Sequence, residues 1–252
     1  GSVGGVDGLS ATAGDMTVLT TAGSLSVNQA VSSTAGNINL TAAGDVSTAA
    51  KIGTAGNIDL LAQGGAITLN GAIDPATVTL TAAGDITVNA AVQADDLITV
   101  TAGTSGAGGV TVNAAGSLTT LAAGGDITVA AGAVSGDITL GGNVTALDAI
   151  QMTALGGAIN QTGGDITAQS LLFNADGSVV LTSAGNDLGT VAGTAASLTI
   201  NDINALDLGT LAIVNNLSVT ALAGNITDSG VITVGGNTVL SVPVANSILL
   251  DE

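Results

Sequence analysis

The sequence predicts an all-β protein, a right-handed, single-stranded parallel β-helix with about 12 coils of about 20 residues each. Three observations predict this fold. A short unit recurs every 20 residues, Gly followed by Asp, Asn or Ser precedes many of the apolar–polar–apolar runs, and the apolar residues are aliphatic with one Phe and no Trp or Tyr. Because the repeat extends almost to both ends, residues 1–252 are predicted to form a single β-helix domain.

The repeated unit predicts columns of stacked residues. It occurs at 36–40, 56–60 and 136–140, and its alternating pattern is typical of a strand with one buried face. The first apolar positions form one predicted inward column: Ile38, Ile58, Val78, Ile98, Leu118 and Ile138. The second inward column is Leu40, Leu60, Leu80, Val100, Thr120 and Leu140. The outward residues between them are Asn39, Asp59, Thr79, Thr99, Thr119 and Thr139.

A second, looser series lies between these units, and its apolar residues are Val46, Ile67, Ile86, Ile127, Ile166 and Ile226. After Gly156 the phase slips by about one residue, which a solenoid tolerates as an insertion in a turn. Gly, Asp and Asn favour turns, whereas Thr, Val and Ile are poor helix formers. A period of 20 leaves no room for a helical crossover, so strands one period apart are predicted to stack in parallel.

Two rival folds fit the period less well. A leucine-rich repeat has a similar length but needs a denser Leu pattern with an Asn ladder. A β-sandwich has no reason to keep residue character at a spacing of 20 over six steps.

Charge and composition exclude several kinds of partner. The net charge is −18, with a single Lys or Arg, so we expect no nucleic-acid partner and no attraction to anionic lipid. The chain has no Cys, and no apolar run approaches the length of a membrane-spanning helix, so we expect no membrane insertion.

Acidic residues that follow Gly are the first candidate site. Calcium prefers carboxylate and carbonyl oxygens, but Asp also favours turns, where its side chain bonds nearby backbone N–H groups. The nonapeptide spacing of calcium-binding β-rolls is missing here, so the turn interpretation is favoured, and no metal or other cofactor is expected. These residues are Asp15, Asp45, Asp85, Asp126, Asp137 and Asp165.

Catalysis is not expected. Asp95 and Asp96 are the best carboxylate pair for a polysaccharide-acting β-helix, but no Arg, His, Trp or Tyr is present to position a sugar. Lys51 lies near a turn and is interpreted as a solvated surface residue. We therefore predict no catalytic residues and no enzymatic activity.

The outward Thr column at 79–139 raises ice binding as another function. Regular Thr arrays on a flat β-helix face would present such a surface, and Thr77, Thr79 and Thr81 alternate within one strand. Asn39 and Asp59 interrupt this column, and Thr is also an ordinary outward strand residue, so ice binding is the weaker hypothesis.

The runs NLTAAGDV at 39–46 and TLTAAGDITV at 79–88 resemble the repeats of filamentous haemagglutinin-like adhesins. These adhesins are exported by two-partner secretion, and related β-helices form autotransporter passengers. The resemblance covers nearly the whole chain. It implies a right-handed parallel β-helix at the outer surface of a Gram-negative cell, with roles in attachment, biofilm formation or contact-dependent toxicity.

We therefore expect the extracellular structural shaft of a bacterial adhesin, whose partners include a host or neighbouring-cell surface. The alternative is a subunit that stacks end to end into an extracellular filament, with itself as partner. This alternative rests on the repeat running to both ends without a polar cap, because open strand edges favour pairing.

Overall fold

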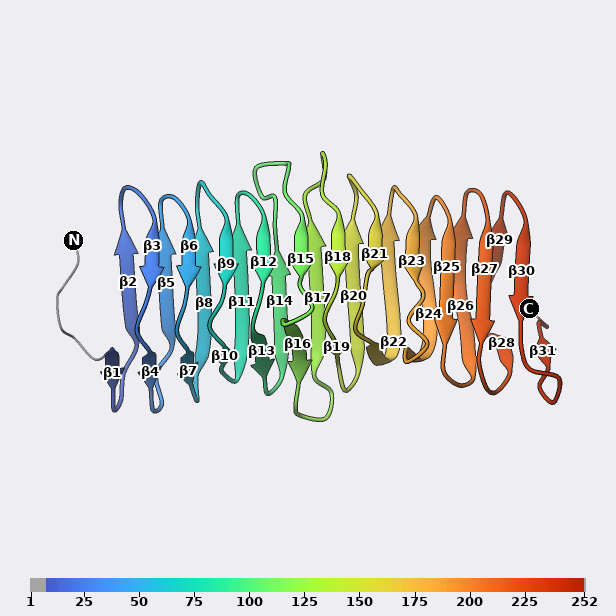
Figure 1. Ribbon diagram of the computed structural model, residues 1–252, viewed down its shortest axis with the longest axis horizontal. Coiled ribbons are helices and arrows are strands. Elements are labelled where there is room, and N and C mark those ends of the chain that lie inside the picture. The colour runs from blue at the N-terminus through green and yellow to red at the C-terminus, as the bar shows by residue number, and fades with distance from the viewer. Residues whose placement is uncertain (1–7, 252) are drawn as a thin grey trace.

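The protein is a parallel β-solenoid of about 11 turns, with about 21 residues per turn and no helix within residues 8–251. The computed structural model describes residues 8–251. The turns stack side by side along one axis, with β1 (Leu9–Ala11) at one end and β31 (Ile248–Leu249) at the other (Figure 1). At about 4.8 Å per stacked turn, this rod is about 50 Å long.

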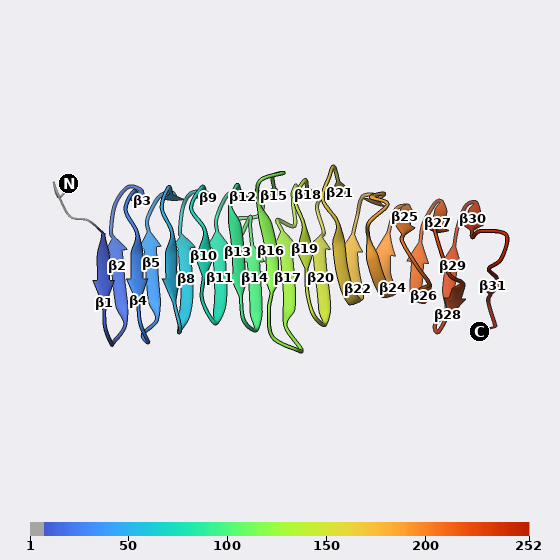
Figure 2. The ribbon, with the colours of Figure 1, turned by 60° about the horizontal axis from the view of Figure 1, so that its bottom comes forward.

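Most turns contain three short strands, which form three faces along the rod (Figures 1 and 2). Face A consists of β2 (Met16–Thr20), β5 (Ile38–Ala42), β8 (Asn57–Ala62), β11 (Thr77–Ala82), β14 (Leu97–Thr101), β17 (Asp126–Ala131), β20 (Ala149–Ala154) and β29 (Ile232–Val234).

Face B is an eleven-stranded sheet to which each turn contributes one strand. Its strands are β3 (Leu25–Val27), β6 (Val46–Thr48), β9 (Ile67–Leu69), β12 (Ile86–Val88), β15 (Val110–Val112), β18 (Ile138–Leu140), β21 (Ile159–Gln161), β23 (Val179–Leu181), β25 (Leu198–Asp202), β27 (Leu217–Ala221) and β30 (Thr238–Ser241).

Face C consists of β1, β4 (Val31–Ser33), β7 (Ile52–Thr54), β10 (Ile73–Asp74), β13 (Ala91–Ala94), β16 (Ser117–Thr120), β19 (Val144–Thr145), β28 (Ile226–Asp228) and β31. Three longer strands run across faces C and A without a corner: β22 (Ile166–Ala175), β24 (Asp187–Ala195) and β26 (Leu206–Ile213). The cross-section of the rod therefore changes at β22.

The core is one continuous apolar column along the axis. Inward side chains such as Ile58, Leu60 and Ile67 are fully buried, and the alternation of buried and less buried residues in β5, β8 and β11 confirms the predicted inward and outward positions. Phe173 is the largest buried side chain and the only aromatic one. A narrow interior repeated many times suits branched aliphatic residues, which fill it without large rings.

The predicted 20-residue columns are right through Ile98 and wrong beyond it. Ile98 pairs with Ile127, which pairs in turn with Ile150. Leu118 lies instead on face C between Val92 and Val144. The predicted members of these columns one period later, Ile138, Thr139 and Leu140, form β18 and lie on face B.

Longer connections explain this error. The chain between β14 and β15, at 102–109, and the chain between β16 and β17, at 121–125, both lengthen the turn that follows Ile98. An apolar residue still occurs 20 positions after Ile98, but it is Leu118, which belongs to a strand of face C. Likewise Thr119 lies outward on face C, and Thr120 is inward there, beside Ala94. The irregularity thus begins before Gly156, and the solenoid has fewer, longer turns than expected.

The looser second series also mixes faces. Val46, Ile67 and Ile86 do stack on face B. Ile127 belongs to face A, and Ile166 and Ile226 belong to the face C column.

Residues 1–7 and 252 of the predicted single domain lie outside the described residues. Within 8–251, no helix is long and apolar enough to cross a membrane.

Candidate functional site

The acidic turn residues bond the backbone of the following turn. Asp45 Oδ1 accepts a hydrogen bond of 2.9 Å from the backbone N–H of Ala66, and Asp85 Oδ1 accepts one of 2.8 Å from Gly109. Equivalent bonds reach from Asp15 to Asn37, from Asp126 to Ala149 and from Asp137 to Ala158. The prediction that these side chains serve turns is close, but the bonds run between turns and not within one.

Asn side chains form the same kind of hydrogen bond between turns at other corners. Asn37, Asn143, Asn216 and Asn225 each accept, through Oδ1, the backbone N–H of a residue one turn further on. Asp165 Oδ1 accepts a side-chain donor of the next turn, the hydroxyl of Ser183, at 2.6 Å. A carboxylate or amide oxygen at a corner therefore satisfies a backbone donor that the short strands leave unpaired.

At the corner that leads into face B, acidic and small residues alternate over six successive turns. The residues that precede the stacked strands β6, β9, β12, β15, β18 and β21 are Asp45, Ala66, Asp85, Gly109, Asp137 and Ala158. Successive carboxylates at this corner are separated by two turns and are therefore roughly 10 Å apart, which is about the Debye length at 0.1 M salt. This spacing limits the repulsion among charges in a chain of net charge −18.

These carboxylates do not converge. Among residues 8–251, no group of three or more His, Cys, Asp or Glu side chains lies close enough to hold a metal ion. Asp95 and Asp96 are both exposed at the corner between β13 and β14. Their backbone N–H groups bond to Pro75 and Ala76 of the preceding turn, so this corner is also part of the stacking.

The structure also contains three buried polar side chains that were not predicted from the sequence: Gln161, Asn186 and Asp202. The amides of Gln161 and Asn186 bond each other twice, at 2.7 and 3.0 Å, in the interior. Asp202 is fully buried, and its two oxygens accept the backbone N–H groups of Leu188 and Asn204. The only sequence signal was polar residues at inward positions, here Gln161 and Asp202.

Burial raises the pKa of the Asp202 carboxyl, the two backbone hydrogen bonds oppose this rise, and the nearby charge of Asp187 adds to it. The three buried polar side chains lie where the rod changes its cross-section, next to β22 and β24. Satisfied buried polar groups such as these fix one packing arrangement.

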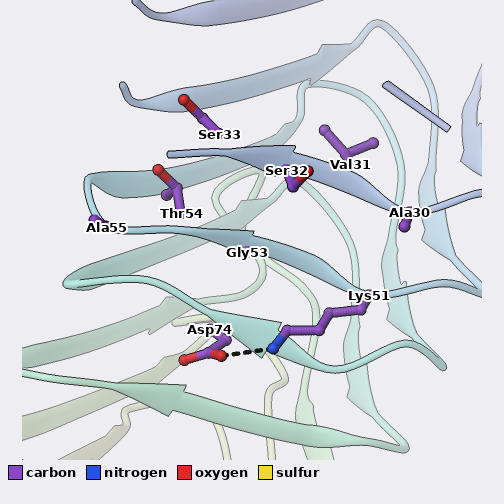
Figure 3. A pocket seen from close by; sticks show the side chains of 9 residues that line it. All are labelled: Ala30, Val31, Ser32, Ser33, Lys51, Gly53, Thr54, Ala55 and Asp74. Carbon is purple, nitrogen blue, oxygen red and sulfur yellow. Dashed lines mark hydrogen bonds and ion pairs between the residues drawn. The ribbon is translucent and has the colours of Figure 1, made fainter. Parts of the chain in front are cut away.

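A surface hollow lies on face C around Gly53 (Figure 3). Lys51 Nζ forms an ion pair of 2.7 Å with Asp74 Oδ2 on the next turn, and both side chains are about half exposed. The prediction of a solvated Lys51 thus holds, with the addition of this carboxylate partner.

The predicted Thr column is only partly present. Thr79, Thr99 and Thr128 stack outward on face A, whereas Thr119 and Thr139 lie on faces C and B. Further along face A, Gln151 and Leu172 take the place of Thr.

Comparison with known proteins gives one partial match. A family model described as repeats of unknown function (DUF5649) matches residues 193–252. This segment begins within β24 and covers the last turns of the rod. No curated protein matches the chain, and no solved structure matches it.

Proposed function

We propose that the protein is the rigid, non-catalytic shaft of an extracellular bacterial adhesin. The observation that carries this proposal is the continuous solenoid, in which about 11 turns share one apolar core and pair their strands without a break. A rod of this kind transmits force and holds other groups at a distance. The repeats at 39–46 and 79–88, which resemble those of filamentous haemagglutinin-like adhesins, support an outer-surface location.

The surface chemistry is consistent with a passive role. The carboxylates are spread along the rod, and Asp202, whose pKa is raised by burial, lies in the interior. The acidic surface favours solubility and discourages lateral association between rods.

The proposal is tested on intact cells of the organism that makes the protein. Antibodies raised against residues 8–251 should label the cell surface in immunogold electron microscopy, and deletion of the coding region should reduce attachment. Label confined to the cell interior, or attachment unchanged by deletion, would contradict the proposal.

A second candidate function is end-to-end assembly into a filament. Strands β29 and β30 pair with β26 and β27, and their inward residues Ile232, Val234 and Leu240 remain only partly buried. A second copy stacking there would cover these side chains and continue the strand ladder. Negative-stain electron microscopy over a concentration series distinguishes the two candidates. Filaments that lengthen with concentration favour assembly, and single short rods favour the shaft.

A further inference from the structure

Face C has a hollow where its outward row of side chains is interrupted. In this row Ser32, Gly53 and Asp74 follow one another on β4, β7 and β10. Gly53 contributes no side chain to this row, and a hollow of about 550 Å³, open to solvent, lies beside it. Figure 3 shows Lys51 extended along this space to Asp74.

The rim of the hollow carries hydrogen-bonding groups of both kinds. The ion pair uses one oxygen of Asp74 and one hydrogen of the Lys51 ammonium. Asp74 Oδ1 and two ammonium hydrogens therefore keep the capacity to bond a ligand. The exposed Ser32 hydroxyl, on the preceding turn, can both donate and accept.

The rest of the lining is Ala30, Val31, Ser33, Thr54, Ala55 and the backbone of Gly53. The hydroxyls of Ser33 and Thr54 already accept backbone N–H groups of Gly36 and Gly56. The aliphatic stem of Lys51 also lies over this strand, because a Cβ atom added to Gly53 would be 3.3 Å from Lys51 Cε. A ligand in the hollow would thus meet an apolar floor and a polar rim.

The charges restrict the chemistry of the ligand. Lys51 and Asp74 neutralise each other, so an anionic or a cationic ligand would have to compete with an existing partner. An anion would also approach a chain of net charge −18. A neutral ligand with neighbouring hydroxyl groups can donate to Asp74 and accept from Lys51 while the ion pair stays formed.

We propose that this hollow binds one sugar residue of a neutral glycan. The C–H groups of the sugar pack on the floor around Gly53, and its hydroxyls bond Asp74, Lys51 and Ser32. This inference goes beyond the proposed shaft function and does not depend on where the rod is located. Because the site is open and covers one side of a ring, we expect a Kd on the order of 1 mM.

Nuclear magnetic resonance of the ¹⁵N-labelled chain tests this proposal, with the methyl glycosides of glucose, galactose, mannose and N-acetylglucosamine as probes. At least one glycoside should shift the amide signals of residues 31–33, 51–55 and 74 in a saturable manner. The decisive variant is Gly53→Val, which fills the hollow. Gly53 has no positive φ, and its nearest neighbour is the flexible end of Lys51, so valine fits this strand.

Thr145→Val is the matched control, because Thr145 is an outward residue further along face C. We expect Gly53→Val to abolish the shifts, Lys51→Ala to weaken binding about tenfold, and Thr145→Val to leave it unchanged. Thermal melts confirm that each variant is folded. The proposal is overturned if none of the four glycosides shifts these signals, or if Gly53→Val binds as the parent chain does.

Discussion

A charged substitution should destabilise the fold far more at an inward position of a strand than at an outward one. Ile98 is fully buried in β14, whereas Thr99 is half-buried and lies between Thr79 and Thr128, which are uncharged. Ile98→Asp places an unpaired carboxylate in the core, so we expect it to lower the free energy of unfolding by at least about 4 kcal/mol. Thr99→Asp should change it by about 0.5 kcal/mol. Urea denaturation measures both, and equal losses would contradict the assignment of faces.

The corner carboxylates stabilise the contact between successive turns. Asp45→Ala leaves the backbone N–H of Ala66 without its acceptor, and we expect a loss of about 1 kcal/mol in the free energy of unfolding. Asp45→Asn removes the same charge but keeps an Oδ1 acceptor, so it should retain most of the stability. If both variants lose stability equally, the charge and not the inter-turn bond is responsible.

Asp202 gives the rod a dependence of stability on pH. Because its pKa is raised in the folded state, the folded protein holds this proton more tightly than the unfolded chain does. The favourable contribution is full below the ordinary pKa of aspartate, about 4, and is lost as the pH rises through the folded-state pKa.

The matched variant is Asp202→Asn, which does not titrate but keeps a polar side chain at this buried position. As the pH rises above about 4, we expect the parent to lose unfolding free energy relative to the Asp202→Asn variant. A difference that is constant across pH 3–7 would contradict the raised pKa.

At the scale of elements, the long strands β22, β24 and β26 replace a corner by a continuous crossing of faces C and A. The register between β24 and β26 shifts between Val191 and Gly193. Gly193 has φ = 146°, and a Cβ atom there would overlap the carbonyl oxygen of Phe173 and press on its ring. This glycine therefore lets the bulge pass directly over the one aromatic residue of the core.

Replacement of this glycine tests that packing. We expect Gly193→Ala to lower the free energy of unfolding by about 2 kcal/mol or more, because both φ and the contact with Phe173 are unfavourable. Gly53→Ala, in an ordinary strand where the nearest neighbour of the new Cβ is the flexible end of Lys51, should change it by about 0.5 kcal/mol or less. Similar melting temperatures for the two variants would show that the bulge relaxes freely.

The sequence predicted elements best where turns have constant length. From β5 to β14 each step is 20 residues, so Ile38, Ile58, Val78 and Ile98 were placed correctly by period alone. Beyond Ile98 a residue of another face fell on the same period, since spacing does not distinguish three similar strands within a turn. Leu118 was misplaced for this reason.

The polar features were harder to predict. The inter-turn bonds of Asp45 and Asp85 can be predicted only when the partner turn is known. Their partners are the backbone N–H groups of Ala66 and Gly109, which no sequence pattern marks. Gln161 and Asn186 meet across 25 positions, at a place where the solenoid changes shape. Neither relation follows from a local pattern.

At the scale of the whole molecule, each turn contacts mainly its two neighbours, so stability is a sum of turn and interface terms. The rod of about 50 Å therefore depends on the pairing of every turn with the next one. A continuous rod requires that the turns keep the observed register across the long connections after β14, with Thr99 beside Thr128.

Disulfide cross-linking tests this register most directly, because the chain has no cysteine of its own. Outward residues of paired strands have Cα atoms about 4.8 Å apart, which a disulfide can bridge. The pair Thr99→Cys with Thr128→Cys should form a bond under mild oxidation, and the pair Thr99→Cys with Thr119→Cys should not. Efficient cross-linking of the second pair and not of the first would contradict the register and, with it, the continuous rod described above.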